Sequence, residues 1–89
     1  MWLVERQTQE MGTMAKSIKL HLLPTDETFK ENLHELRAIQ AVVSHVNVVR
    51  DGTARSCDFV PRVMPDGWFD YGFRCLLSEI SSVTVYLRI

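Results

Sequence analysis

Residues 57–75 predict a long β-hairpin with one register, and this hairpin constrains the fold more than any other part of the chain. Its expected turn is Pro65-Asp66-Gly67, in which proline sets φ for one turn position and glycine supplies the left-handed residue that closes a three-residue loop. With Met64 opposite Trp68, one face becomes apolar and the other carries opposite charges, and such pairs fix the register. The expected pairs are Val63 with Phe69, Pro61 with Tyr71, Phe59 with Phe73, Cys57 with Cys75, Arg62 with Asp70 and Asp58 with Arg74.

The segment before this hairpin predicts a strand and a helix. Residues 17–23 alternate between apolar and polar, which is typical of a half-buried strand. From Phe29 to Val46 apolar residues recur at intervals of three and four, which indicates a helix with one buried stripe. Thr25 is its expected N-cap. Its expected end lies near His45, or as early as Val42 because the residues there are β-branched.

Two further turns complete an α+β fold, a single small domain in the order β-α-β-β-β-β with one helix packed on a curved antiparallel sheet. Asp51-Gly52 is a strong signal for a two-residue hairpin turn, and it pairs Arg50 with Thr53 and Val46 with Cys57. Residues 76–82 are expected to connect to a final alternating strand over 83–89. If this strand lies at a sheet edge, it can pair with a second copy in a dimer.

The 89 residues suffice for one domain, which we assign to residues 17–89, and residues 1–16 are expected to form a flexible leader. A formal net charge of -1 argues against a strongly electrostatic nucleic-acid binder. The chain lacks an apolar run of the roughly 20 residues that span a bilayer, and it lacks the apolar core of a signal peptide. We therefore expect a cytoplasmic protein without a membrane partner.

The sequence contains no residue pattern of a catalytic site. His21, His34 and His45 have no carboxylate or cysteine at a recognised spacing, and neither a nucleophile elbow nor a phosphate-binding loop is present. Cys57 and Cys75 face each other in the predicted hairpin, so they form either two buried thiols, which a reducing cytosol favours, or a disulfide. We expect no enzyme activity, no cofactor and no metal.

The aromatic residues of the hairpin divide into an expected core and one exposed spot. The expected core aromatics are Phe59, Phe69, Tyr71 and Phe73. Trp68 lies with Met64 on the charged face, beside Arg62 and Asp70, and tryptophan and arginine dominate protein-binding hot spots. These four residues predict a protein-binding site, although the same spot could form the rim of a dimer interface or lie under the leader. The predicted function is a non-catalytic regulatory or inhibitory module that binds another protein or itself.

A short basic strand, a Pro-Thr turn and a helix that opens on acidic residues follow one another in Lys16-Ser17-Ile18-Lys19-Leu20-His21-Leu22-Leu23-Pro24-Thr25-Asp26-Glu27. This opening, within the segment 16–46, resembles the N-terminal strand and helix of transposon-encoded RNA-guided nucleases of the TnpB type. In that family the segment belongs to the part that holds nucleic acid, which implies backbone contacts for Lys19 and His21. The family's acidic catalytic residues and zinc ribbon have no counterpart in this chain. The alternative function is nucleic-acid binding through Lys19, His21, Arg50, Arg55 and Arg62.

Overall fold

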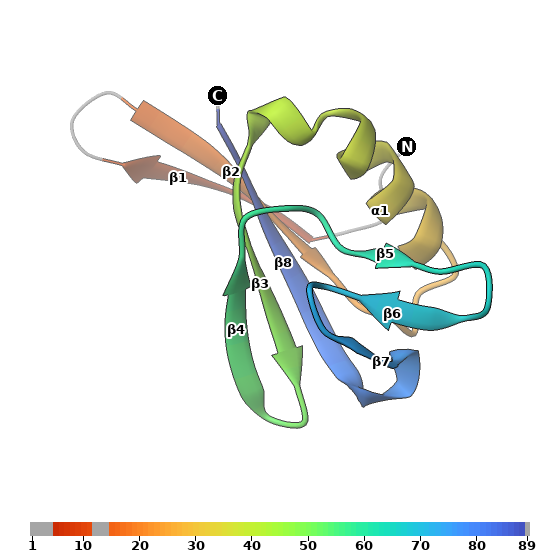
Figure 1. Cartoon of the computed structure of the whole chain (residues 1–89). Coiled ribbons are helices and arrows are strands. Elements are labelled where there is room, and N and C mark those ends of the chain that lie inside the picture. Colours follow the sequence, from red (N-terminus) through yellow and green to blue (C-terminus); the bar gives the residue numbers. More distant parts are fainter. Residues whose placement is uncertain (1–4, 12–14, 89) are drawn as a thin grey trace.

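The computed structural model describes residues 5–11 and 15–88, and these form two layers (Figure 1). One layer is a five-stranded antiparallel sheet, and the other combines the helix with a three-stranded sheet. The α+β class expected from the sequence is confirmed, with more strands than predicted. The elements are β1 (Glu5–Met11), β2 (Ala15–Leu22), α1 (Phe29–Ala38), η1 (Gln40–Val42), β3 (Val43–Arg50), β4 (Thr53–Cys57), β5 (Arg62–Val63), β6 (Trp68–Asp70), β7 (Arg74–Leu76), η2 (Leu77–Glu79) and β8 (Ile80–Arg88).

The last strand, β8, lies at the centre of the five-stranded sheet, whose order is β1-β2-β8-β3-β4. It pairs with β2 on one side and with β3 on the other, so Val85 lies between Leu20 and Val46. These three side chains are buried, as expected for the sheet face that the second layer covers. The hypothesis that the final strand is a free edge for pairing across a dimer is therefore wrong, because both of its edges are occupied within one chain.

The predicted Asp51-Gly52 hairpin is confirmed. It joins β3 to β4, and Arg50 pairs with Thr53 and Val46 with Cys57 as expected. Both turn residues have positive φ, 48° for Asp51 and 80° for Gly52, which is the backbone of the turn that matches the twist of two antiparallel strands. β3 begins at Val43, whereas the predicted pairing begins at Val46.

The prediction for the Pro65-Asp66-Gly67 hairpin is confirmed next to the turn and is wrong for the residues further from it. The Met64 N–H donates to the Trp68 carbonyl at 2.7 Å, and Arg62 with Asp70 and Val63 with Phe69 pair as predicted. The chain then reverses at Gly72, whose φ is 97°, so β7 folds back onto β6 and Cys75 pairs with Phe69.

The outer half of the predicted hairpin does not form, because its first arm bonds to the helix end instead. The Val60 N–H donates to Gln40 Oε1 at 2.7 Å, and its carbonyl accepts a hydrogen bond from Arg37 Nη1 at 2.8 Å. Cys57 pairs with Val46 in the larger sheet, and both cysteines are free and buried. The predicted pairs that are absent from the ladder are Pro61 with Tyr71, Phe59 with Phe73, Cys57 with Cys75 and Asp58 with Arg74.

This change of path divides the predicted aromatic core. Phe69 and Tyr71 are buried as expected, with 0% and 5% of their surface exposed. Phe59 and Phe73 are 40% and 51% exposed, so their assignment to the core is wrong. Phe73 lies outside because the chain reverses at Gly72, and Phe59 lies outside because its arm bonds to the helix end through Val60.

The helix is shorter than predicted at both ends. It begins at Phe29, after Thr28 rather than Thr25, and the Thr28 side chain makes no capping hydrogen bond. It ends at Ala38, and the turn η1 leads directly into β3, which takes up the β-branched residues expected at the helix end. Phe29, Leu33 and Leu36 form the buried stripe of α1.

Strand β1 lies within the segment predicted as a leader. It pairs with β2 along its length, from Glu5 opposite His21 to Met11 opposite Ala15. Residues 1–4 and 12–14, which also belong to the predicted leader, lie outside the described residues. Within the described part of the chain, no helix has the length and apolar character needed to cross a membrane.

Candidate binding surface

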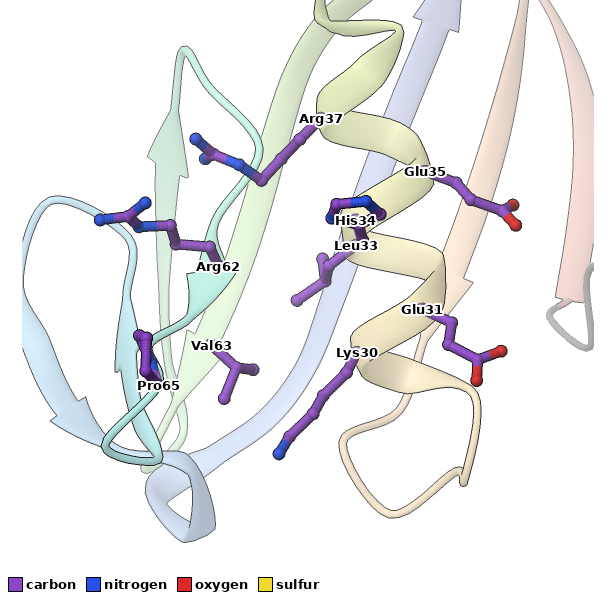
Figure 2. A pocket seen from close by; sticks show the side chains of 9 residues that line it. All are labelled: Lys30, Glu31, Leu33, His34, Glu35, Arg37, Arg62, Val63 and Pro65. Carbon is purple, nitrogen blue, oxygen red and sulfur yellow. The ribbon is translucent and has the colours of Figure 1, made fainter.

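A groove with a volume of about 740 Å³ runs between α1 and β5 (Figure 2). We call it the basic groove. Its lining residues are Lys30, Glu31, Leu33, His34, Glu35, Arg37, Arg62, Val63 and Pro65. Leu33 is buried and Val63 half-buried, so the groove has an apolar floor with charged side chains around it.

The charges of the basic groove are unevenly distributed. Lys30, His34 and Arg37 follow one another at helical intervals of four and three, which places them on one side of α1. Figure 2 shows Lys30 and Arg37 extending on the side of the helix that faces β5, and Glu31 and Glu35 on the other side. The residues nearest to β5 are therefore mainly cationic.

The outer face of the three-stranded sheet adjoins this groove through Arg62. Val63, Phe69 and Cys75 pair across the sheet and face the core, so the alternate residues face outward. One outward row holds Met64, Trp68 and Leu76, and the next holds Arg62, Asp70 and Arg74. The four residues predicted to bind a protein, Met64, Trp68, Arg62 and Asp70, thus lie together on this outer face.

Trp68 and Leu76 are the apolar residues most exposed on the outer face, at 40% and 50%. Asp66 holds this region in place: Oδ1 accepts the Trp68 N–H at 3.1 Å, and Oδ2 pairs with Arg74 Nη2 at 2.8 Å. The hydrogen bond from Trp68 and the charge of Arg74 lower the pKa of the Asp66 carboxyl. Arg74 in turn lies 5.8 Å from the centre of the Trp68 ring. The tryptophan is therefore exposed, while both its backbone and its ring contact neighbouring residues.

Four of the five residues proposed for nucleic-acid binding lie on two opposite faces of the larger sheet, and the fifth, Arg62, lies on β5 of the three-stranded sheet. Lys19 pairs with Tyr86 and His21 with Thr84, on the open face that points away from α1. Arg55 pairs with the buried Val48 on the covered face, and its guanidinium carbon lies 4.4 Å from the centre of the Phe73 ring. The sequence pattern therefore does not correspond to one continuous basic patch.

Arg50, also on the covered face, is engaged within the chain. Its guanidinium bonds to Glu79 Oε1 at 3.0 Å and to the Tyr71 hydroxyl at 3.4 Å. These bonds, led by the one to Tyr71, raise the pKa of Arg50. The Leu76 N–H and Arg50 together lower the pKa of Glu79. Arg50 thus ties β3 to the connection before β8, and its charge is compensated.

The two cysteines are buried and do not form a metal-binding centre with acidic residues among residues 18–88, whose side chains the structure describes. Burial raises the pKa of both thiols, and Cys57 Sγ donates to the Tyr71 carbonyl at 3.4 Å. No group of three histidine, cysteine or acidic side chains gathers as a metal site among residues 18–88.

The structure adds residues that the sequence analysis did not select. Lys30, His34 and Arg37 of the basic groove had a detectable signal, because their spacing places them on one side of a helix. The open face holds a second feature, the rings of His45 and Tyr86, which stack with their centres 4.1 Å apart. Only the pairing of β3 with β8 brings these two rings together.

Comparisons with protein-family models, with curated proteins and with solved structures found no match to this chain. They therefore do not bear on the resemblance to TnpB-type nucleases.

Proposed function

We propose that this protein is a non-catalytic interaction module that binds another protein, or a second copy of itself, through the outer face of the three-stranded sheet. The observation that supports this proposal is the row of Met64, Trp68 and Leu76 beside the charged row of Arg62, Asp70 and Arg74. Exposed apolar side chains bordered by charges are typical of interaction sites. We expect the module in the cytoplasm, where free thiols such as Cys57 and Cys75 stay reduced.

The position of Trp68 favours binding energetically. An interface gains little from a side chain that must first be ordered, and ordering costs about 0.5–1.5 kcal/mol per flexible side chain. The Trp68 backbone is bonded to Met64 and Asp66, and Arg74 lies against the ring. Much of this ordering is thus complete before a partner arrives.

The test compares Trp68→Ala with Phe59→Ala, because both aromatics are 40% exposed and only Trp68 lies on the outer face. Tagged protein is cross-linked in cells and captured, and sedimentation over a range of concentrations reports self-association. We expect Trp68→Ala to abolish capture of the partner or dimer formation, and Phe59→Ala to leave both unchanged. Equal behaviour of the two variants, or a strict monomer without any captured protein, would contradict the proposal.

A second candidate function is binding of single-stranded nucleic acid on the open face. It is favoured by Lys19 beside the stacked His45 and Tyr86 rings, since bases stack on exposed rings and phosphates bind cations. Among residues 18–88, no carboxylate lies on this face. Glu5, in the neighbouring strand β1, is the register partner of His21. This function is also what the resemblance to TnpB-type nucleases implies.

The nucleic-acid candidate is tested by titrating a labelled single-stranded oligonucleotide at several salt concentrations. We expect affinity to fall steeply with salt, and Lys19→Glu to weaken binding while Lys30→Glu, on the other side of the molecule, does not. A flat salt dependence would remove this candidate.

A further inference from the structure

We propose that the basic groove binds an acidic segment of the partner in extended conformation, as an additional strand on the free edge of β5. This inference rests on the proposed function, since it specifies which chemistry a protein partner presents. It concerns the groove rather than the outer face, and the two adjoin at Arg62.

The edge of β5 that faces the groove has unused backbone groups. In an antiparallel pair, hydrogen-bonded and non-hydrogen-bonded positions alternate. Because Met64 is hydrogen-bonded to Trp68, the next position, Val63, directs its N–H and carbonyl away from β6. Val63 also lines the groove between β5 and α1. An extended peptide in the groove can therefore pair with Val63 through two backbone hydrogen bonds.

The charge of the groove selects the kind of peptide. Lys30, Arg37 and Arg62 line the groove beside β5, and among residues 18–88 none of them has a carboxylate within 4.0 Å. Arg37 also donates a hydrogen bond to the Val60 carbonyl, so Lys30 and Arg62 are the cations more available to a peptide. Glu31 and Glu35 extend on the other side of α1 (Figure 2). Such unpaired cations complement a segment that carries glutamate or aspartate.

The apolar floor distinguishes a peptide from other anions. Alternate side chains of an extended peptide point to opposite sides, so acidic residues can face the cations while apolar residues face Val63 and Pro65. The volume of about 740 Å³ lies within the range of roughly 300–1,000 Å³ that is typical of binding sites. A nucleic-acid backbone would use the cations but could not form strand pairs with Val63.

The experiment uses a short labelled peptide that alternates glutamate and valine, titrated into the full chain and followed by fluorescence anisotropy. Its controls are the peptide with glutamine in place of glutamate, and a peptide N-methylated on the edge that would pair with β5. We expect the acidic peptide to bind, and both control peptides to bind at least about tenfold more weakly, which corresponds to ~1.4 kcal/mol.

Variants of the protein locate the site. Lys30→Glu and Arg62→Glu should each weaken binding of the acidic peptide about tenfold. Lys19→Glu, an equal charge change on the open face, should not. Circular dichroism checks that all three variants remain folded.

Failure to bind, equal affinities for Lys30→Glu and Lys19→Glu, unchanged binding of the N-methylated peptide, or tighter binding of an oligonucleotide at the groove would overturn the inference. If the peptide fails while Trp68→Ala still abolishes partner capture, only the chemistry assigned to the groove is wrong. If partner capture does not depend on Trp68, the proposed function itself fails.

Discussion

At the scale of single residues, the two phenylalanines on either side of Tyr71 occupy opposite environments. The Phe69 ring lies 6.3 Å from that of Phe29 and 5.7 Å from that of Tyr71, centre to centre, within the core. Phe73 is half exposed, and Arg55 lies against its ring. Burial, rather than residue type or neighbouring sequence, therefore determines what each ring contributes to stability.

Phe69→Ala should lower the free energy of unfolding by about 3–5 kcal/mol, because it removes a buried ring and leaves a cavity. Phe73→Ala should lower it by only about 1 kcal/mol, since roughly half of the ring surface stays in water at this site. Urea denaturation followed by tryptophan fluorescence measures both. Equal losses in the two variants would show that Phe73 belongs to the core after all.

At the scale of elements, the turn between β6 and β7 determines the path of the second layer. Gly72 has a φ of 97°, and its N–H donates to Asp70 Oδ1 at 3.0 Å. Asp70 thus uses its carboxylate for the turn rather than for an ion pair with Arg62 in the described part of the chain. The turn sends Cys75 back to Phe69 and leaves Arg62 available at the groove.

Gly72→Ala should destabilise the protein by about 1–3 kcal/mol, the usual cost of an unfavourable backbone conformation. A Cβ at this position would meet only the Phe59 ring, at 3.6 Å, so the cost comes from φ and not from a clash. Ser78→Ala, at an exposed position of η2, is the control in chemical denaturation. An unchanged midpoint for Gly72→Ala would mean that the turn adopts another backbone conformation.

Glu79 links η2 to β3 and should make stability depend on pH. Its pKa is lowered in the folded state, first by the Leu76 N–H and then by Arg50. A lowered pKa means that the stabilisation is present above the unfolded value of about 4.3 and is lost as pH falls through the folded value. Glu79→Gln should therefore reduce the loss of stability between neutral and acidic pH, measured by denaturation at a series of pH values.

Asp66 provides the comparison for this pH dependence, because its pKa is lowered in the same direction. Asp66→Asn should also reduce the loss of stability between neutral and acidic pH, and the double variant should reduce that loss further. A pH profile that is identical in wild type and Glu79→Gln would show that the carboxylate does not hold its partners in solution.

At the scale of the whole molecule, stability should be highest in the middle of the five-stranded sheet. β8 and β3 each have two neighbouring strands, and they carry the buried residues Val46, Val48, Val83 and Val85. β4 is an edge strand, with exposed side chains from Thr53 to Ser56. The sheet therefore has a protected centre and an open edge.

Native-state hydrogen exchange should reproduce this order. The amides of Val83 and Val85 should exchange most slowly, because they are released only by global unfolding. In β4, the amides of Ala54 and Ser56 should exchange fast, since the hairpin ladder leaves them facing the open edge. Slow exchange at Ala54 and Ser56 would reveal a strand paired with β4, as in a dimer.

The sequence predicted the fold class and the tips of both hairpins, because these depend on a few consecutive residues. Asp51-Gly52 and Pro65-Asp66-Gly67 have the backbone conformations and pairs expected of them. It also predicted that Met64, Trp68, Arg62 and Asp70 share one face, since that requires only the alternation of two short strands. The groove was not predicted, because it depends on how α1 and β5 lie relative to each other, and no local sequence pattern contains that information.

The sequence alone therefore determined local features: the alternation of apolar and polar residues in β2, the turns, and the buried stripe of α1. The tertiary structure decided which strand is central, where the second hairpin ends, and which aromatics are covered. It did so because Val60 bonds to the helix end instead of continuing the ladder, and because β8 lies between β2 and β3. Such choices depend on competition between distant partners, which periodicity and turn chemistry do not describe.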